Sequence, residues 1–387
     1  MYAKRVDQIK PFRVMEILAR AGELEALGHR VVHFEVGEPD FDTAEPIVSA
    51  GRQALSDGRT RYTTATGIEP LRDVIAQYYE GIGVALDPGR IVVTAGASGG
   101  LALLAGLLLD PGSEVLITDP GYPANEVFVR LVGGSPALMS IGAQQQFRPS
   151  LVDVRAAWRE QTRGALLASP ANPTGAMMTA DSIREISAFI AGRDGFFILD
   201  EIYQGLVNDP PYASALQIDE NLFVLNSFSK YFGMTGWRLG WVVVPEHAVA
   251  GITKLAQNVF ISPSSVAQYA AVAAFSDSAV AIHEERAQVF RDRCKQLADG
   301  LHDLGFVVPV MPDGAFYLYV DVSHTGLTSG EFCLRLLDDY HVAVTPGEDF
   351  GQHHHDRYVR FAYTTSAEDI AIGLERIRNA LTHWGCA

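Results

Sequence analysis

The chain has 387 residues, of which 48% are hydrophobic, so it can bury a large core and form more than one structural unit. Its formal net charge of −16 argues against nucleic acid or an anionic membrane as a partner. The three cysteines are far apart and form no C-x-x-C pair, so neither a disulfide scaffold nor a zinc site is expected. The N-terminus lacks the apolar core of a signal peptide, and no run of about 18 apolar residues occurs. The sequence therefore predicts a cytoplasmic protein.

The first regular segment is helical. Residues 11–28 carry apolar side chains at helical spacing and end at a glycine. Residues 31–36 are typical of a short strand, which leads into the turn-forming string Gly-Glu-Pro-Asp-Phe at 37–41.

From residue 91 onward, apolar runs alternate with segments of helical periodicity. Such alternation is typical of an α/β protein with a doubly wound, mostly parallel sheet flanked by helices. A long charged helix is expected at 279–304, and the more irregular strands and helices after it indicate a smaller α+β unit. The expected strands of the large sheet cover residues 91–95, 114–118, 164–168, 195–199 and 222–225, and a further apolar run at 241–244 is expected to form the strand after a polar turn.

The polar turn around Lys230 carries the strongest chemical signal. This lysine lies between apolar runs, so we expect its ammonium to be partly desolvated and to lose its proton easily. A neutral lysine amine attacks carbonyl groups, whereas Ser227, Ser229 and Arg238 are residue types that bind phosphate. Carbonyl and phosphate together suggest the cofactor pyridoxal 5′-phosphate (PLP).

The string Ser-x-Ser-Lys at 227–230, followed by Gly-x-Arg-x-Gly at 236–240, resembles the Schiff-base signature of the class I/II aminotransferases. These enzymes form the aspartate aminotransferase superfamily, PLP fold type I, and the resemblance extends in family order from Gly37 to Arg360. It implies a large PLP-binding domain and a smaller α+β domain built from both termini. The implied boundaries are 1–44 for the N-terminal part of the small domain, 45–280 for the large domain, and 281–387 for a connector helix and the C-terminal part of the small domain.

A phosphate site is expected after the first strand of the large sheet. The backbone amides of Ala97, Ser98 and Gly99 would lie at a helix N-terminus, which favours phosphate, although nucleotide-binding folds use the same device. The resemblance adds Tyr62, in a Y-x-x-x-x-G pattern whose tyrosine reaches the cofactor phosphate of a neighbouring subunit. It therefore implies a homodimer, whereas an exposed loop tyrosine is the alternative.

Four residues are implied as contacts of the pyridine ring. Tyr122 would stack on it, and Asn172, in an Asn-Pro-x-Gly turn, would bond its oxygen and lie near the substrate carboxylate. Asp200 follows a buried strand at the end where α/β sheets bind ligands, and its carboxylate would keep the ring nitrogen protonated. Tyr203 would donate to the ring oxygen. Taken alone, Asp200 would be interpreted as a helix cap, and this interpretation gives way only beside Asn172, Tyr203 and Lys230. For Tyr122 the alternative is a turn tyrosine that packs locally.

Arg360 lies in an apolar strand, where an unpaired charge is costly. The resemblance implies that it binds the substrate α-carboxylate by a two-pronged ion pair, assisted by Asn172 and Gly37, whereas a structural salt bridge is the alternative. We expect the pocket for the substrate side chain to favour apolar or small groups and to be lined by Phe12, Val14, Ile17 and Phe316.

Together these motifs predict a PLP-dependent aminotransferase that moves an amino group between an L-amino acid and a 2-oxo acid by a ping-pong mechanism. Lys230, which would carry the cofactor as an aldimine, Asp200 and Tyr203 are the expected catalytic residues. The same apparatus would also serve a lyase, decarboxylase or racemase. A PLP-binding regulator without turnover is disfavoured because no basic DNA-binding segment is attached. The string His-His-His-Asp at 353–356 does not indicate a metal site, because adjacent histidines cannot easily converge on one ion.

Overall fold

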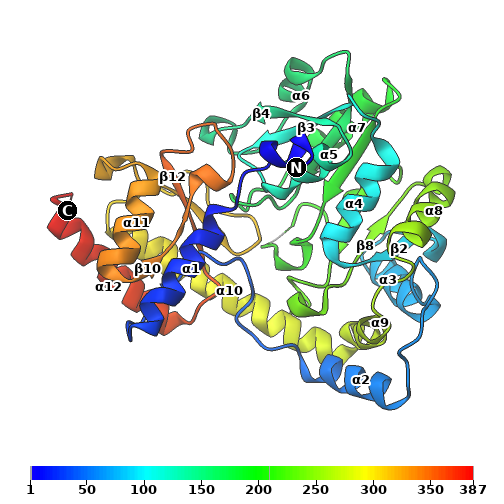
Figure 1. Ribbon diagram of the computed structural model, residues 1–387, viewed down its shortest axis with the longest axis horizontal. Coiled ribbons are helices and arrows are strands. Elements are labelled where there is room, and N and C mark those ends of the chain that lie inside the picture. Colours follow the sequence, from blue (N-terminus) through cyan, green and yellow to red (C-terminus); the bar gives the residue numbers. More distant parts are fainter. Residues whose placement is uncertain (1, 209, 387) are drawn as a thin grey trace.

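The computed structural model describes residues 2–208 and 210–386. It has a large domain built on a seven-stranded sheet of order β2-β8-β7-β6-β5-β3-β4 and a small domain beside it (Figure 1). Strand β8 is antiparallel to both of its neighbours, and the other pairs in the sheet are parallel. The expected α/β class is therefore confirmed. The strands are β2 (Ile91–Thr94), β3 (Glu114–Asp119), β4 (Ser135–Ser140), β5 (Thr162–Ala168), β6 (Phe196–Asp200), β7 (Phe223–Ser227) and β8 (Gly240–Val243).

The central strands are buried along their whole length, and apolar except at their carboxyl ends, because helices cover both faces of the sheet. Every residue of β6 and of β7 is buried. The expected strands are present with slightly different ends, but β4 was not among them. It lies at the edge of the sheet, its burial alternates along the strand, and it contains Pro136, which an edge strand tolerates. Its sequence therefore lacks the continuous apolar run that marks the central strands.

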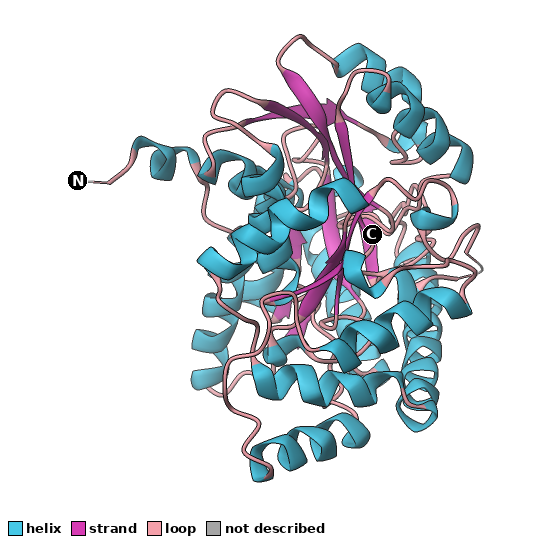
Figure 2. Cartoon of the chain, turned by 90° about the vertical axis from the view of Figure 1, so that its right-hand side faces the viewer, coloured by secondary structure: helices cyan, strands magenta, loops and turns pink. Residues whose placement is uncertain are grey.

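Helices surround the strands of the sheet (Figure 2), and an apolar layer lies on each face of the sheet. One layer joins alternate strand residues such as Val92 and Leu225 to α4 (Gly96–Leu108), α5 (Ala124–Leu131) and α8 (Val249–Val259). The opposite layer contains the intervening residues, including Trp241. It packs against α2 (Glu45–Ser56), α3 (Glu69–Gly81), α6 (Leu151–Ala157), α7 (Ala180–Ala191) and α9 (Ser265–Val272).

The small domain combines both ends of the chain. A three-stranded antiparallel sheet has the order β11-β12-β9, and β1 from the N-terminal segment pairs in parallel with β10. One apolar core joins residues 17–34 to residues 287–381. The elements are α1 (Arg13–Ala26), β1 (Val32–His33), β9 (Tyr317–Asp321), α11 (Ser329–Tyr340), β10 (Val342–Ala343), β11 (Thr345–Pro346), β12 (Tyr358–Ala362) and α12 (Ala367–Trp384).

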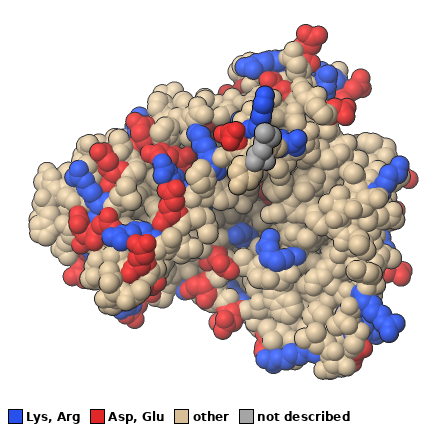
Figure 3. All heavy atoms as spheres, in the orientation of Figure 1, with Lys and Arg blue, Asp and Glu red and all other residues tan. Residues whose placement is uncertain are grey.

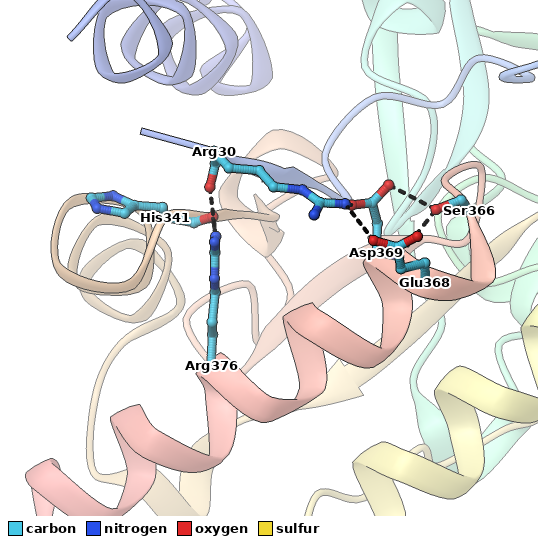
Figure 4. A network of polar contacts seen from close by, with 6 residues as sticks. All are labelled: Arg30, His341, Ser366, Glu368, Asp369 and Arg376. Carbon is cyan, nitrogen blue, oxygen red and sulfur yellow. Dashed lines mark hydrogen bonds and ion pairs between the residues drawn. The ribbon is translucent and has the colours of Figure 1, made fainter. Parts of the chain in front are cut away.

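A polar network ties the N-terminal segment to α12 (Figure 4). The Arg376 guanidinium donates to the carbonyl oxygens of Arg30 and His341, at 2.7 and 2.9 Å, next to the paired strands β1 and β10. Arg30 in turn lies 2.7 Å from Asp369, whose carboxylate accepts from the Ser366 hydroxyl. Because these groups are largely exposed, the ion pair contributes little stability, and its value lies in fixing the register of β1 on the C-terminal half.

Helix α10 (Asp277–Asp303) connects the domains, running from the region of α2 and α9 into the small domain in Figure 1. It crosses the expected boundary at residue 280, so the exact division of the chain stays a prediction. Among the described residues no single helix is long and apolar enough to cross a membrane. One bent pair, Ser265–Phe275 with Asp277–Asp303, meets the criteria of length and composition.

Two glycines of α4 provide a test of its packing on the sheet. A Cβ on Gly100 would lie 2.5 Å from Leu225 and 2.9 Å from Val242, whereas one on Gly106 would meet nothing closer than 3.8 Å. We expect Gly100→Ala to lower the free energy of unfolding by about 1–3 kcal/mol through overpacking. The matched Gly106→Ala should raise it by about 0.5–1 kcal/mol through helix propensity. Urea unfolding of the two variants checks this, and equal effects would contradict the packing described.

Candidate active site

A cavity of about 330 Å³ opens where the two domains meet. Its floor is formed by residues that follow the carboxyl ends of large-domain strands, which is where open α/β sheets bind ligands. Its other walls come from α1 and from the small domain. Figure 3 shows this face of the molecule hollowed near its centre, with basic side chains at the hollow.

Most of the predicted site residues line this cavity although they come from distant parts of the sequence. Those that do are Gly37, Ala97, Ser98, Tyr122, Asn172, Asp200, Tyr203, Ser229, Lys230, Arg238 and Arg360.

Three predicted contacts lie elsewhere. Ser227 is 1% exposed and lies behind Ser229, whose amide donates to the Ser227 hydroxyl at 3.1 Å. Gly99 is buried within α4. Tyr62 is 81% exposed and does not reach the cavity of its own chain.

Lys230 projects from the turn after β7 into the cavity, where its Nζ donates to the Gly37 carbonyl at 2.7 Å. Burial lowers the pKa of this amine to about 8, and the positive charge of Arg360 acts in the same direction. The expected desolvation is therefore present, and a sizeable fraction of the amine is neutral near pH 8.

Asp200 ends β6 and is 6% exposed. It accepts a hydrogen bond from the Ile202 amide at 3.0 Å, and burial raises its pKa to about 6, with that amide and Lys230 opposing the rise. A buried carboxylate with so few donors is well suited to a cationic N–H partner from a ligand, as a protonated pyridine nitrogen would be. The residues present therefore fit PLP at this end of the cavity.

The backbone at the start of α4 lies close to the Arg238 guanidinium and to the start of β8. A Cβ on Gly96 would lie 2.7 Å from the Arg238 guanidinium, and one on Gly240 would lie 2.9 Å from the backbone of Gly96. Glycine at both positions lets the arginine and the amides that begin α4 converge. Ser98, Ser229 and Thr235, the last of which sequence reasoning missed, line the same end of the cavity. This is the donor set of a phosphate site.

Arg360 lies on β12, 5% exposed, between the rings of Tyr317 and Phe350 at 4.3 and 4.8 Å. Its guanidinium donates to Asn172 Oδ1 at 3.0 Å and to the Glu35 carbonyl at 2.6 Å, which are both neutral acceptors. Among the described residues it has no carboxylate partner, and its Nε has no hydrogen-bond partner. The alternative of a structural salt bridge therefore has no partner in the described part of the chain, and the buried charge is suited to an anionic ligand.

Tyr317 is a site residue that sequence reasoning missed. Its hydroxyl lies 2.9 Å from the Tyr203 hydroxyl, and a Cβ on Gly37 would lie 2.0 Å from it. The sequence feature that could have revealed Tyr317 is the apolar string at 314–320, which contains most of β9, because side chains of a strand point alternately to its two sides. Two expected pocket residues, Ile17 and Phe316, pack instead in the core of the small domain. Phe12 and Val14 do line the cavity.

Comparisons with known proteins agree with this geometry. Residues 29–377 match the family model for aminotransferase class I and II. The chain belongs to this family. It is 37% identical to a (5-formylfuran-3-yl)methyl phosphate transaminase of Methanocaldococcus jannaschii, over 98% of this chain and 100% of the relative. It is 35% identical to a valine–pyruvate aminotransferase of Mycobacterium tuberculosis, over 95% and 96% of the two chains.

Solved structures lead to the same family. A crystal structure of an aminotransferase from Mycobacterium tuberculosis superposes with a TM-score of 0.95 and 34% identity, covering 99% of each chain. Family, relatives and fold together make this protein a PLP-dependent aminotransferase that acts on amino acids and 2-oxo acids. The prediction of enzyme class and cofactor is confirmed.

The depressed pKa of Lys230 has a consequence for stability that can be measured without cofactor. A lysine whose folded pKa lies below its unfolded value destabilises the fold while it is protonated, and the penalty disappears as pH rises from about 8 to 10.5. We expect Lys230→Met to stabilise the cofactor-free protein at pH 7 by about 1–2 kcal/mol, less than the full shift in pKa implies because the amine lines an open cavity. The gain should vanish above pH 10.5.

Urea unfolding of the cofactor-free protein at several pH values measures this difference. The exposed Lys254→Met on α8 is the control and should show no such pH dependence. A Lys230 variant that is no more stable than wild type at pH 7 would contradict the desolvation of this amine.

Proposed function

We propose that Lys230 is the residue that carries the cofactor and moves the proton during transamination. The supporting observation is its position on the cavity floor, with a pKa lowered to about 8. When bound, PLP supplies an aldehyde that condenses with amines and a ring that takes up electrons from the bond broken at the substrate Cα. With the substrate amine in its place on the cofactor, the Lys230 amine would be free to take the proton from the substrate Cα and to deliver it to the carbon of the cofactor's former aldehyde group.

Asp200, Asn172 and Tyr203 position the ring in this proposal. The Asp200 carboxylate holds the ring nitrogen in its protonated form. Because Asn172 Oδ1 accepts from Arg360, the NH₂ group of this amide remains to donate to the ring oxygen. Burial raises the pKa of Tyr203 well above its usual value, so its phenol keeps its proton at neutral pH and donates to the same oxygen. Tyr122 covers the ring face, supported by its place in the cavity lining.

Arg238, Ser98, Ser229 and the amides that begin α4, at Ala97, Ser98 and Gly99, bind the phosphate in this proposal. Ser227 acts indirectly, through its contact with the Ser229 amide. At the opposite end Arg360 binds the substrate α-carboxylate, supported by the absence of a carboxylate partner among the described residues.

We also propose a homodimer in which Tyr62 reaches the partner's phosphate site. Its large exposed side chain, outside the cavity of its own chain, supports this assignment. A cytoplasmic location is proposed as well and is supported by three free cysteines, two of them buried. The two curated relatives act on different compounds by their names, one on valine and one on a furanylmethyl phosphate, so those names do not fix the substrate of this chain.

Borohydride reduction tests the lysine assignment. In the wild-type protein we expect the cofactor mass to be fixed at Lys230, as read by peptide mass spectrometry. Lys230→Ala should bind PLP without covalent fixation and lose activity by a factor of about 10⁴ or more. A 2-oxo acid added after reaction with an amino acid should restore the starting cofactor spectrum, which a lyase or racemase would not require. Covalent fixation retained in Lys230→Ala would contradict the proposal.

A hybrid dimer tests the role of Tyr62. Tyr62→Ala should weaken PLP binding by about tenfold or more through loss of a hydrogen bond to a charged group. A dimer that pairs a Lys230→Ala protomer with a Tyr62→Ala protomer has one site with both native residues if Tyr62 acts across the interface. PLP affinity and activity should then return at that site. If Tyr62 served its own chain, neither site would be intact and the hybrid would behave like its parents.

A further inference from the structure

The cavity extends beyond the proposed cofactor and carboxylate contacts to an apolar recess. Phe12, Val14 and Leu18 line it from the start of α1, and Phe350 lines it from the small domain. Val14 and Leu18 are one helical turn apart and therefore on the same face of α1. The neighbouring stripe of α1, with Ile17, Ala21 and Leu24, packs in the core of the small domain.

The proposed function already assigns a role to each basic residue of the cavity. Within the described residues, the basic side chains that line the cavity are Lys230, Arg238 and Arg360. They serve the cofactor aldehyde, its phosphate and the substrate α-carboxylate, respectively. A substrate with a second carboxylate on its side chain would need a further cation, and among the described residues no further cation lines this cavity. Lys10, Arg13 and Arg130 line the adjoining cavity of about 440 Å³, which lies on the other side of Phe12 and Phe350.

An acidic side chain occupies this part of the cavity instead. Asp349 is 8% exposed, directly precedes Phe350 and lines the cavity with it. Its carboxylate accepts from the backbone amides of Arg13 and Val14, at 2.6 and 2.8 Å, in the first turn of α1. Phe12, the N-cap residue, offers no side-chain acceptor of its own, so Asp349 satisfies these amides from another element. It thereby fixes α1 over the cavity and places a negative charge beside the recess.

We propose that the substrates are amino acids, and matching 2-oxo acids, with uncharged apolar side chains, and that Asp349 is the positioning residue for this specificity. This inference rests on the proposed function, because it takes Arg360 as the site of the α-carboxylate. The apolar end of the substrate packs between Val14, Leu18 and Phe350. Asp349 holds that wall in place and repels a second carboxylate.

Two unreactive probes of equal shape test the proposal on the holoenzyme. 4-Methylpentanoate and succinate differ only in an isopropyl group where succinate has a carboxylate, and neither carries an amine. Their dissociation constants follow from the change in the cofactor absorbance or from calorimetry. We expect 4-methylpentanoate to bind roughly tenfold tighter or more. Equal or tighter binding of succinate overturns the inference.

Two variants assign the preference to the recess. Val14→Lys supplies the missing cation, so it should weaken 4-methylpentanoate and strengthen succinate, each by several-fold. Ala19→Lys, which adds the same charge at an exposed position of α1, is the control and should leave the ratio unchanged. Asp349→Asn should raise the affinity for succinate and so reduce the difference between the dissociation constants of the two probes. If Val14→Lys leaves the ratio of the two dissociation constants unchanged, the substrate side chain does not lie in the recess. This outcome overturns the inference even if Asp349→Asn does not fold.

Failure of this inference is distinguishable from failure of the proposed function. Arg360→Lys should weaken both probes alike, because both use the same carboxylate site. Leucine and aspartate, the amino acids of the same two shapes, can then be compared in the half-reaction. A protein that converts aspartate faster than leucine is an aminotransferase with the wrong predicted substrate. A protein without cofactor fixation at Lys230 contradicts the function itself.

Discussion

The site depends on a buried lysine amine that loses its proton more easily than a lysine in water. Burial and the nearby charge of Arg360 lower the pKa of Lys230 to about 8. Burial likewise raises the pKa of Asp200 to about 6, so both groups carry a charge less readily than they would in water. The chain as a whole has a net charge of −16, which would favour a protonated lysine. Local desolvation therefore outweighs the general field of the protein at this point.

That environment exists only because the two ends of the chain meet. The carbonyl that accepts from Lys230 belongs to Gly37, and the one that accepts from Arg360 belongs to Glu35. Both lie just after β1, which pairs with β10 in the C-terminal half. The network around Arg376 in Figure 4 fixes this pairing at the end of the strands remote from the site. Assembly of the small domain is thus a condition for the charge balance of the cavity.

The sequence predicted the fold class and most cavity residues because both leave local signals. Buried strands are continuous apolar runs, and Lys230, Asp200 and Asn172 lie directly after or near strand ends, where the fold brings them together. The edge strand β4 left no such signal. Ser227 and Ser229 are two residues apart, yet only the second lines the cavity, and spacing alone cannot show which of the two is buried. The role of Asp349 was invisible because its partners are backbone amides more than 300 residues away in sequence.

The residues proposed for the chemistry and those proposed for substrate choice come from different parts of the structure. The floor, with Lys230 and Asp200, belongs to the sheet of the large domain, where a changed side chain would disturb packing on both faces. The recess is built from α1 and Phe350, and the neighbouring stripe of α1, with Ile17, enters the core of the small domain. Because neither Val14 nor Leu18 belongs to a core cluster, their replacement alters the recess with little effect on the fold. A fold of this kind can acquire a new substrate by changes in one short helix while the residues that move the proton stay as they are.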